Sequence, residues 1–164
     1  LASRTEAFDA IRAEPTLVDA AVEEMLRYDT PAQVNARVVR EPMTLGGRQL
    51  ARGELVFAML GAANRDPRVF ARPDQFDIFR TDVAAHTSFG GGAHYCLGAA
   101  LARMEVRTLV RRLTARFGSL ELGTGGLQRH RRQNLRGLSA LHLRADRDLG
   151  RPGAAHTAIG AQLS

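Results

Sequence analysis

The sequence predicts an α+β chain that is mostly helical and carries a small sheet. Three observations favour this class. The longest helical pattern runs from Leu97 to Phe117 and is followed by Gly118, a typical residue after a helix end. A second, shorter helical pattern ends before Pro31. Between the two, apolar residues alternate or run together over short stretches, as they do in strands.

Two helices are expected in the first thirty residues. The first covers residues 5–13 and ends at Glu14-Pro15. Thr16 is expected to cap the second helix, because threonine is a favourable residue at this position. The expected buried face of the second helix consists of Leu17, Ala21, Met25 and Tyr28.

The middle and end of the chain predict strands joined by turns and a long loop. Val34, Ala36 and Val38 alternate with polar residues, which indicates a half-buried strand, and Gly46-Gly47 then indicates a turn. The run ELVFAMLG, residues 54–61, predicts a buried strand. Residues 64–88 show no period and predict a long ordered loop. Residues 135–143 predict a last strand pair, and residues 144–164 a disordered tail.

Composition narrows the class of protein. The chain has 164 residues, 45% of them hydrophobic, which suffices for one core. All 23 basic residues are arginine, and the net charge of +6 suits an acidic protein, an anionic cofactor or nucleic acid. No apolar run approaches the ~20 residues of a membrane helix. A single cysteine excludes an internal disulfide and fits a cytoplasmic location. The opening LASRTEAFDA reads as the middle of a helix, so we expect a fragment of a longer protein.

The stretch FGGGAHYCLG, residues 89–98, holds the only cysteine. A lone cysteine is usually a small buried hydrophobe. Here, however, glycines allow close approach of the backbone, and Cys96 stands at a helix entry that favours a thiolate. A zinc site would need more ligands than His94 and Cys96, and a cysteine nucleophile lacks a clear third member. A phosphate loop would need a lysine. Thiolate ligation of a haem iron remains.

The pattern Phe89-x-x-Gly92-x-x-x-Cys96-x-Gly98 resembles the haem-binding signature of the cytochrome P450 superfamily, in its soluble bacterial class. Glu24-x-x-Arg27 resembles the family's Glu-x-x-Arg pair. The segment ANRDPRVFARPDQFDIFR and the run LRGLSALHL also resemble family segments. The resemblance therefore implies that residues 1–143 are the C-terminal part of a cytochrome P450 fold, and that residues 144–164 lie beyond it.

The resemblance implies a role for each matching residue. Cys96 would be the thiolate ligand of haem b, and Arg37 and His94 would bind the propionates. Glu24 and Arg27 would brace the cysteine loop, while the third place of that network holds Gln75, which brings no charge. The remaining cofactor-binding residues would be Ser88, Phe89, Gly90, Gly92, Leu97, Gly98 and Ala102.

The implied activity is monooxygenation: hydroxylation of a small organic substrate by molecular oxygen, with electrons from a redox protein such as a ferredoxin. The family's oxygen-activating helix would precede Leu1, so the alternative is a non-catalytic remnant that binds haem weakly or not at all. Val34 and Leu135 are substrate-facing candidates.

Arg103, Arg107 and Arg111 recur every four residues and share one helix face. They are either a solvated face, a docking face for the redox protein, or a nucleic-acid contact. Nucleic acid is least favoured, because only 5% of residues are aromatic and none is tryptophan.

Overall fold

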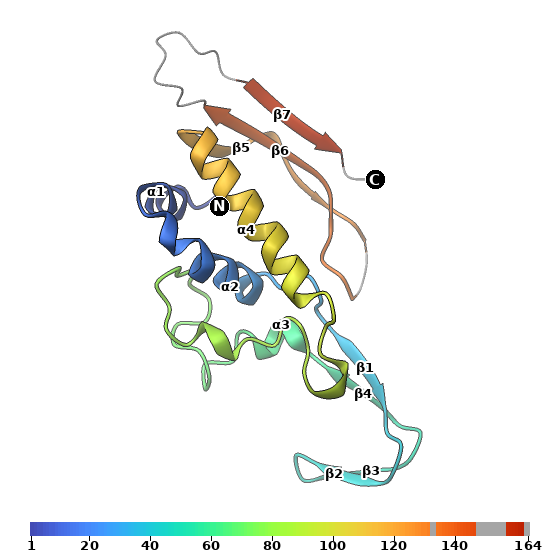
Figure 1. Cartoon of the computed structure of the whole chain (residues 1–164). Coiled ribbons are helices and arrows are strands. Elements are labelled where there is room, and N and C mark those ends of the chain that lie inside the picture. Colours follow the sequence, from blue (N-terminus) through green and yellow to red (C-terminus); the bar gives the residue numbers. More distant parts are fainter. Residues whose placement is uncertain (132–133, 147–156, 163–164) are drawn as a thin grey trace.

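The computed structural model describes residues 1–131 and 134–146 and the backbone of residues 157–162. Helices form its body (Figure 1). They are α1 (Thr5–Ala13), α2 (Val18–Tyr28) and α4 (Ala99–Arg116), and a short 3-10 turn, η1 (Pro15–Leu17), joins the first two. The helices agree with the sequence prediction to within two residues at each end. Their packing buries a core of Ile11, Val18, Ala21, Val22, Ile78 and Val110.

The start of α2 differs from its prediction. Thr16 does not cap the helix, because it lies within η1 and its hydroxyl donates to the Glu14 carboxylate, 2.8 Å away. The buried face also differs: Val18, Ala21 and Val22 are fully buried, whereas Met25 and Tyr28 are only partly so. The predicted buried face began at Leu17, but Leu17 belongs to η1 and the α-helix begins one residue later, at Val18.

Two antiparallel strand pairs follow α2, the second lying between the strands of the first along the chain. Strand β1 (Asn35–Val38) pairs antiparallel with β4 (Leu55–Ala58), and β2 (Met43–Leu45) pairs with β3 (Arg48–Leu50). The predicted turn at Gly46-Gly47 is confirmed, with φ of +56° and +79° at the two glycines. Both values suit a two-residue hairpin turn, which needs positive φ at its two central positions. The β2–β3 hairpin extends away from the helices (Figure 1).

The predicted burial of β1 and β4 is wrong for this chain. Val38, Leu55 and Phe57 are each about 60% exposed, at 61%, 61% and 59%. The two strands form a ribbon on their own, and no other strand of the described residues pairs with them. Only their flanks are covered, where Val39 and Leu60 are buried. The ribbon therefore presents an apolar surface to solvent.

The C-terminal part forms a three-stranded antiparallel sheet, ordered β5 (Ser119–Arg129), β6 (Leu138–Asp146) and β7 (Thr157–Gln162). The sequence predicted β6 but not β5, whose LGTGG centre has three glycines, a residue depleted in strands. β5 and α1 close a second core of Phe8, Phe117, Leu120 and Ala145. Within the stretch predicted as a tail, β6 continues to Asp146 and residues 157–162 pair with it. The rest of 144–164 lies outside the described residues.

A long loop connects α3 (Leu60–Ala63) to α4. Apart from two 3-10 turns, η2 (Val83–Ala85) and η3 (Gly92–His94), this segment has no regular structure, as predicted. It lies against α2 and the entry of α4 (Figure 1). None of the helices among the described residues is long and apolar enough to cross a membrane.

Candidate functional site: the cysteine loop and its brace

The cysteine loop, residues 86–98, presents Cys96 as an exposed free thiol. Its backbone closes on itself: the Cys96 N–H donates to the Phe89 carbonyl at 3.0 Å, and the Tyr95 N–H donates to the Gly92 carbonyl at 3.0 Å. Gly90 and Gly92 adopt φ of +73° and +65°, which side chains rarely tolerate. The alternative of a buried structural cysteine is therefore wrong.

The surroundings of the thiol fit a flat apolar group with a metal at its centre. Leu97 is completely exposed and Leu101, one turn on, is 54% exposed, so both present apolar surface beside Cys96. A Cβ at Gly98 would stand 3.9 Å from the Cys96 sulfur, in van der Waals contact. A thiol donor flanked by unpartnered apolar side chains suits haem far better than a solvated ion.

Strand β1 lies beside this loop (Figure 1). The Asn35 side-chain amide is 3.7 Å from the position that a Cβ at Gly90 would occupy. Arg37 stands two residues after Asn35 and so shares its face of the strand. Its guanidinium is exposed and, within the described part of the chain, donates only to the carbonyl of Ala36, at 2.8 Å. His94, in η3, is also exposed, and Ala102 is half-buried. Propionate binding by Arg37 and His94 stays a prediction.

Ser88 holds the loop from inside. Its side chain is buried, its hydroxyl donates to the Leu26 carbonyl at 2.7 Å, and it accepts the Asn64 amide at 2.9 Å. Because both contacts are with the protein, the structure gives Ser88 a positioning role, and its cofactor contact stays a prediction.

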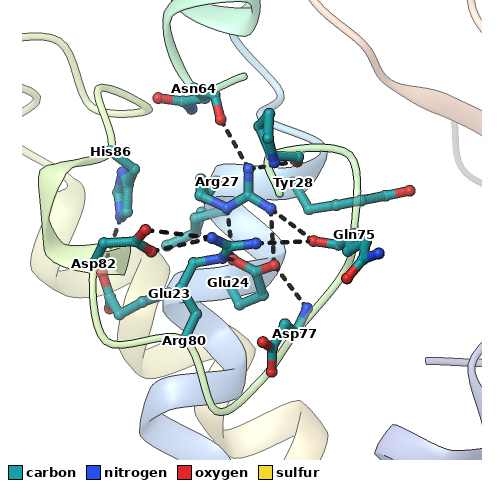
Figure 2. Close-up of polar contacts among 12 residues, drawn as sticks. Glu23, Glu24, Arg27, Tyr28, Asn64, Gln75, Asp77, Arg80, Asp82 and His86 are labelled. Carbon is teal, nitrogen blue, oxygen red and sulfur yellow. Dashed lines mark hydrogen bonds and ion pairs between the residues drawn. The ribbon is translucent and has the colours of Figure 1, made fainter. Parts of the chain in front are cut away.

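Beneath the loop, Glu24 and Arg27 form a buried ion pair (Figure 2). Arg27 donates to both Glu24 oxygens, at 2.6 Å and 2.8 Å. Its remaining N–H groups reach three carbonyls of the long loop, those of Asn64, Pro73 and Gln75, at 2.8–3.1 Å. Glu24 also accepts the Asp77 N–H at 2.9 Å. One ion pair of α2 thus fixes several turns of an irregular segment.

The third member of this network is Arg80, which the sequence prediction missed. Its Nε lies 3.3 Å from Glu24, and its side chain is only 4% exposed (Figure 2). Gln75, the predicted occupant, is exposed and contributes only its carbonyl, to Arg27 and Arg80. The sequence prediction placed the third member within the Pro-x-x-Phe segment. In the structure, the Arg80 N–H donates to the Asp77 carbonyl and closes a turn, and this turn brings the arginine of FDIFR into the network.

Asn64 connects this brace to the cysteine loop and was also missed. It is fully buried. Its side-chain oxygen accepts the Thr87 N–H at 2.7 Å and the Thr87 hydroxyl at 3.0 Å, while its own carbonyl accepts Arg27. The sequence offered only a polar residue at the start of the predicted loop, where asparagine is common, so no signal set it apart.

The two substrate-facing candidates lie in neighbouring segments. Residues 31–33 and 134–136 run antiparallel, with Ala32 opposite Leu135. The Gln33 N–H donates to the Asn134 carbonyl at 2.9 Å, next to Val34. Leu135 is 42% exposed and Val34 is half-buried. Their contact with a substrate stays a prediction.

The three arginines of α4 face α2 and are paired. Arg103 binds Glu23 at 2.7 Å, Arg107 binds Asp19 at 2.9 Å, and Arg111 lies 3.6 Å from Asp19. Ion pairs thus join the two helices at Arg103 and Arg107, whereas Arg111 stays mostly exposed to solvent. Docking of a redox protein stays a prediction, with Arg111, 59% exposed, offering the most surface of the three.

Comparison with known proteins agrees with this geometry. The cytochrome P450 family model matches residues 9–133. A biotin biosynthesis cytochrome P450 of Bacillus subtilis is 47% identical over 112 residues, 68% of this chain and 28% of that protein. The cytochrome P450 monooxygenase PikC of Streptomyces venezuelae is 42% identical over 147 residues, 88% of this chain and 35% of that protein.

Solved structures give the same result. A crystal structure of P450BioI, in complex with an acyl carrier protein ligated to hexadec-9Z-enoic acid, superposes with a TM-score of 0.80 at 41% identity. It covers 84% of this chain and 36% of that one. Substrate-free CYP150A6 of Mycobacterium marinum gives 0.83 at 32% identity, over 87% and 37% of the two chains. The chain spans about a third of the length of these relatives, and it belongs to the cytochrome P450 family.

Proposed function

We propose that this chain is the C-terminal, haem-ligating part of a bacterial monooxygenase that hydroxylates a small organic molecule. The observation that carries the proposal is the Cys96 thiol, exposed at the mouth of α4 on a loop that backbone hydrogen bonds and a buried ion-pair network hold in place. Haem b, when bound, would supply activation of molecular oxygen, favoured by electron donation from a thiolate ligand.

The chain's own residues would contribute binding and orientation. Cys96 would hold the metal, and Leu97 and Leu101 would cover part of the porphyrin face, because the described residues leave their apolar surface exposed. Arg37 and His94 would neutralise the propionates, since cations and strong donors stabilise carboxylates. Phe89, whose carbonyl already accepts the Cys96 N–H, would shield the sulfur from water.

Electrons would come from an acidic redox protein such as a ferredoxin, which the net charge of +6 favours by electrostatic steering. One related structure contains an acyl carrier protein and not a ferredoxin. The proposal of a ferredoxin therefore rests on the charge of this chain. A cytoplasmic location stays a prediction.

A second candidate function, a remnant without catalysis, is favoured by one observation. The faces of β1 and β4 and of the start of α4 expose large apolar side chains, including Val38, Leu55 and Phe57 at about 60%. A haem bound by this chain alone would keep one side uncovered and lose the corresponding contact area.

Haem titration of the purified chain separates the two. The monooxygenase proposal predicts stoichiometric haem uptake and, after reduction and addition of carbon monoxide, a thiolate-type Soret band. Cys96→Ser should abolish that band, and Cys96→His should convert it to an imidazole type. Weak uptake with no thiolate band in the unaltered chain would favour the remnant.

A further inference from the structure

The Arg103 side chain of α4 contacts both the cysteine loop and α2. Its Nε and one terminal nitrogen donate to the two Glu23 oxygens at 2.7 Å and 2.9 Å. Its other terminal nitrogen donates to the Tyr95 hydroxyl at 3.1 Å. The guanidinium carbon also lies over the Phe89 ring, 4.5 Å from its centroid. Phe89 and Tyr95 stand at the two ends of the segment that closes on Cys96.

The Glu23 carboxylate receives a second donor from the start of the loop. His86 Nε2 lies 3.0 Å from Glu23 (Figure 2), and the imidazole is 3% exposed. His86 Nδ1 accepts the Ser88 N–H at 3.2 Å. In the neutral ring the proton is therefore on Nε2, so His86 donates to Glu23. One carboxylate of α2 thus holds His86 directly, and Phe89 and Tyr95 through Arg103.

Hydrogen bonds to a charged group contribute about 1.5–3 kcal/mol each, more than a neutral pair. Arg103 is 23% exposed and Glu23 is 19% exposed, so solvent screens the pair less than it screens a surface pair. In agreement, the pKa of Glu23 is lowered: partial burial acts to raise it, but hydrogen bonds from Arg103 and His86 outweigh that effect.

Arg107 provides the comparison within the same helix. It lies one turn further on, and its Nε binds Asp19 at 2.9 Å while a terminal nitrogen lies 3.8 Å from Glu23. Its ion pairs thus join α4 to α2, as the pair of Arg103 does. Unlike Arg103, whose guanidinium also contacts Tyr95 and Phe89, Arg107 has its acidic partners on α2. If these arginines only joined α4 to α2, replacing Arg103 and replacing Arg107 would affect the cysteine loop equally.

We propose that Arg103, with Glu23 and His86, is a positioning device that fixes the cysteine loop and thereby the place and orientation of the Cys96 sulfur. The proposal deepens the proposed function, since it concerns the residue expected to ligate haem, but its geometry exists without haem. Arg103 acts here as a positioning residue, because three of its five N–H donors bind Glu23 and Tyr95 within the chain.

Hydrogen exchange of the backbone amides in the full chain tests the proposal without any cofactor. In Arg103→Gln, the protection of the Cys96 and Tyr95 amides should fall about tenfold, which corresponds to about 1.4 kcal/mol. Protection in the middle of α2 and α4 should change less than threefold. Arg107→Gln, the matched control, should leave the loop amides within about twofold of the unaltered chain.

Equal loss of protection in the loop and in both helices, or an equal effect of Arg107→Gln on the loop, would overturn the proposal. If Arg103→Gln unfolds the chain, Arg103→Lys decides. Lysine keeps the charge, but one ammonium cannot bind both Glu23 oxygens and the Tyr95 hydroxyl while covering the Phe89 ring. Loop-specific loss is again expected, and an unchanged loop contradicts the proposal.

The haem-loaded protein gives an independent readout. Arg103→Gln should increase the fraction of reduced, carbon monoxide-bound protein that has lost thiolate ligation by at least threefold over Arg107→Gln, because a loosened loop protonates and releases its sulfur more readily. Failure of haem binding in the unaltered chain would remove the proposed function and leave the exchange result standing.

Discussion

Replacing Arg80 by methionine tests whether this residue completes the buried network beneath the cysteine loop. Methionine keeps much of the aliphatic stem and removes the charge. Glu24 would keep its two hydrogen bonds from Arg27 but would lose the second cation, now 3.3 Å away. The carbonyls of Ala71 and Arg72 would lose the donors that Arg80 supplies, at 2.5 Å and 3.1 Å.

The magnitude follows from burial. Glu24 and Arg27 are at most 1% exposed and Arg80 is 4% exposed, so water cannot replace the lost partner easily. Breaking a buried pair costs about 3–5 kcal/mol, and we expect the lower end, about 3 kcal/mol, since Arg27 remains. Against a typical total of about 5–15 kcal/mol this is a large loss. With an m-value of about 2 kcal/mol/M, the urea midpoint should fall by about 1.5 M.

Urea unfolding followed by far-ultraviolet circular dichroism measures this effect, and Gln75→Ala is the matched control. Because the Gln75 side chain is exposed and only its carbonyl takes part in the network, its replacement should change the free energy of unfolding by less than about 0.5 kcal/mol. A loss below 1 kcal/mol for Arg80→Met, or equal losses for the two variants, would refute the assignment of Arg80 as the third member.

Three further predictions concern acid stability, loop anchoring and docking. The pKa of Glu23 is lowered from its ordinary 4.5, so its contribution to stability is present above that pH and is lost as pH falls through the folded-state value. Urea titrations at a series of acid pH values should show that Glu23→Gln flattens this part of the plot of stability against pH. Asn64→Ala should cost about 2–4 kcal/mol, because it removes three hydrogen bonds of a fully buried side chain, and thermal unfolding would show a smaller loss if the amide were dispensable. Arg111→Glu should lower turnover supported by a ferredoxin at least threefold and leave peroxide-driven turnover unchanged, whereas Arg112→Glu, on another helix face, should affect neither; equal loss in both assays would exclude docking at Arg111.

The elements that could be predicted from sequence are those with a strong local signal. The helix over residues 97–117 was predictable because its apolar period is long and Gly118 ends it. The turn at Gly46-Gly47 was predictable because two glycines tolerate positive φ. Strand β5 was not, since its central glycines have low strand propensity and its order comes from pairing with β6.

Burial and long-range polar contacts required the structure. The apolar run of residues 54–61 predicted a buried strand, yet burial depends on what covers a strand, and the described chain leaves Leu55 and Phe57 exposed. Likewise, the cysteine motif identified Cys96, but nothing local indicated that Asn64, Arg80 and Glu23 support its loop. These contacts join residues tens of positions apart, and a single sequence carries no sign of such pairing.

The direct test of the central claim is the first coordination shell of iron in the haem-loaded protein, measured by X-ray absorption at the iron edge. The account predicts one sulfur neighbour in the unaltered protein that disappears in Cys96→Ser. A shell of nitrogen and oxygen alone in the unaltered protein, or a sulfur neighbour that persists in Cys96→Ser, would contradict it.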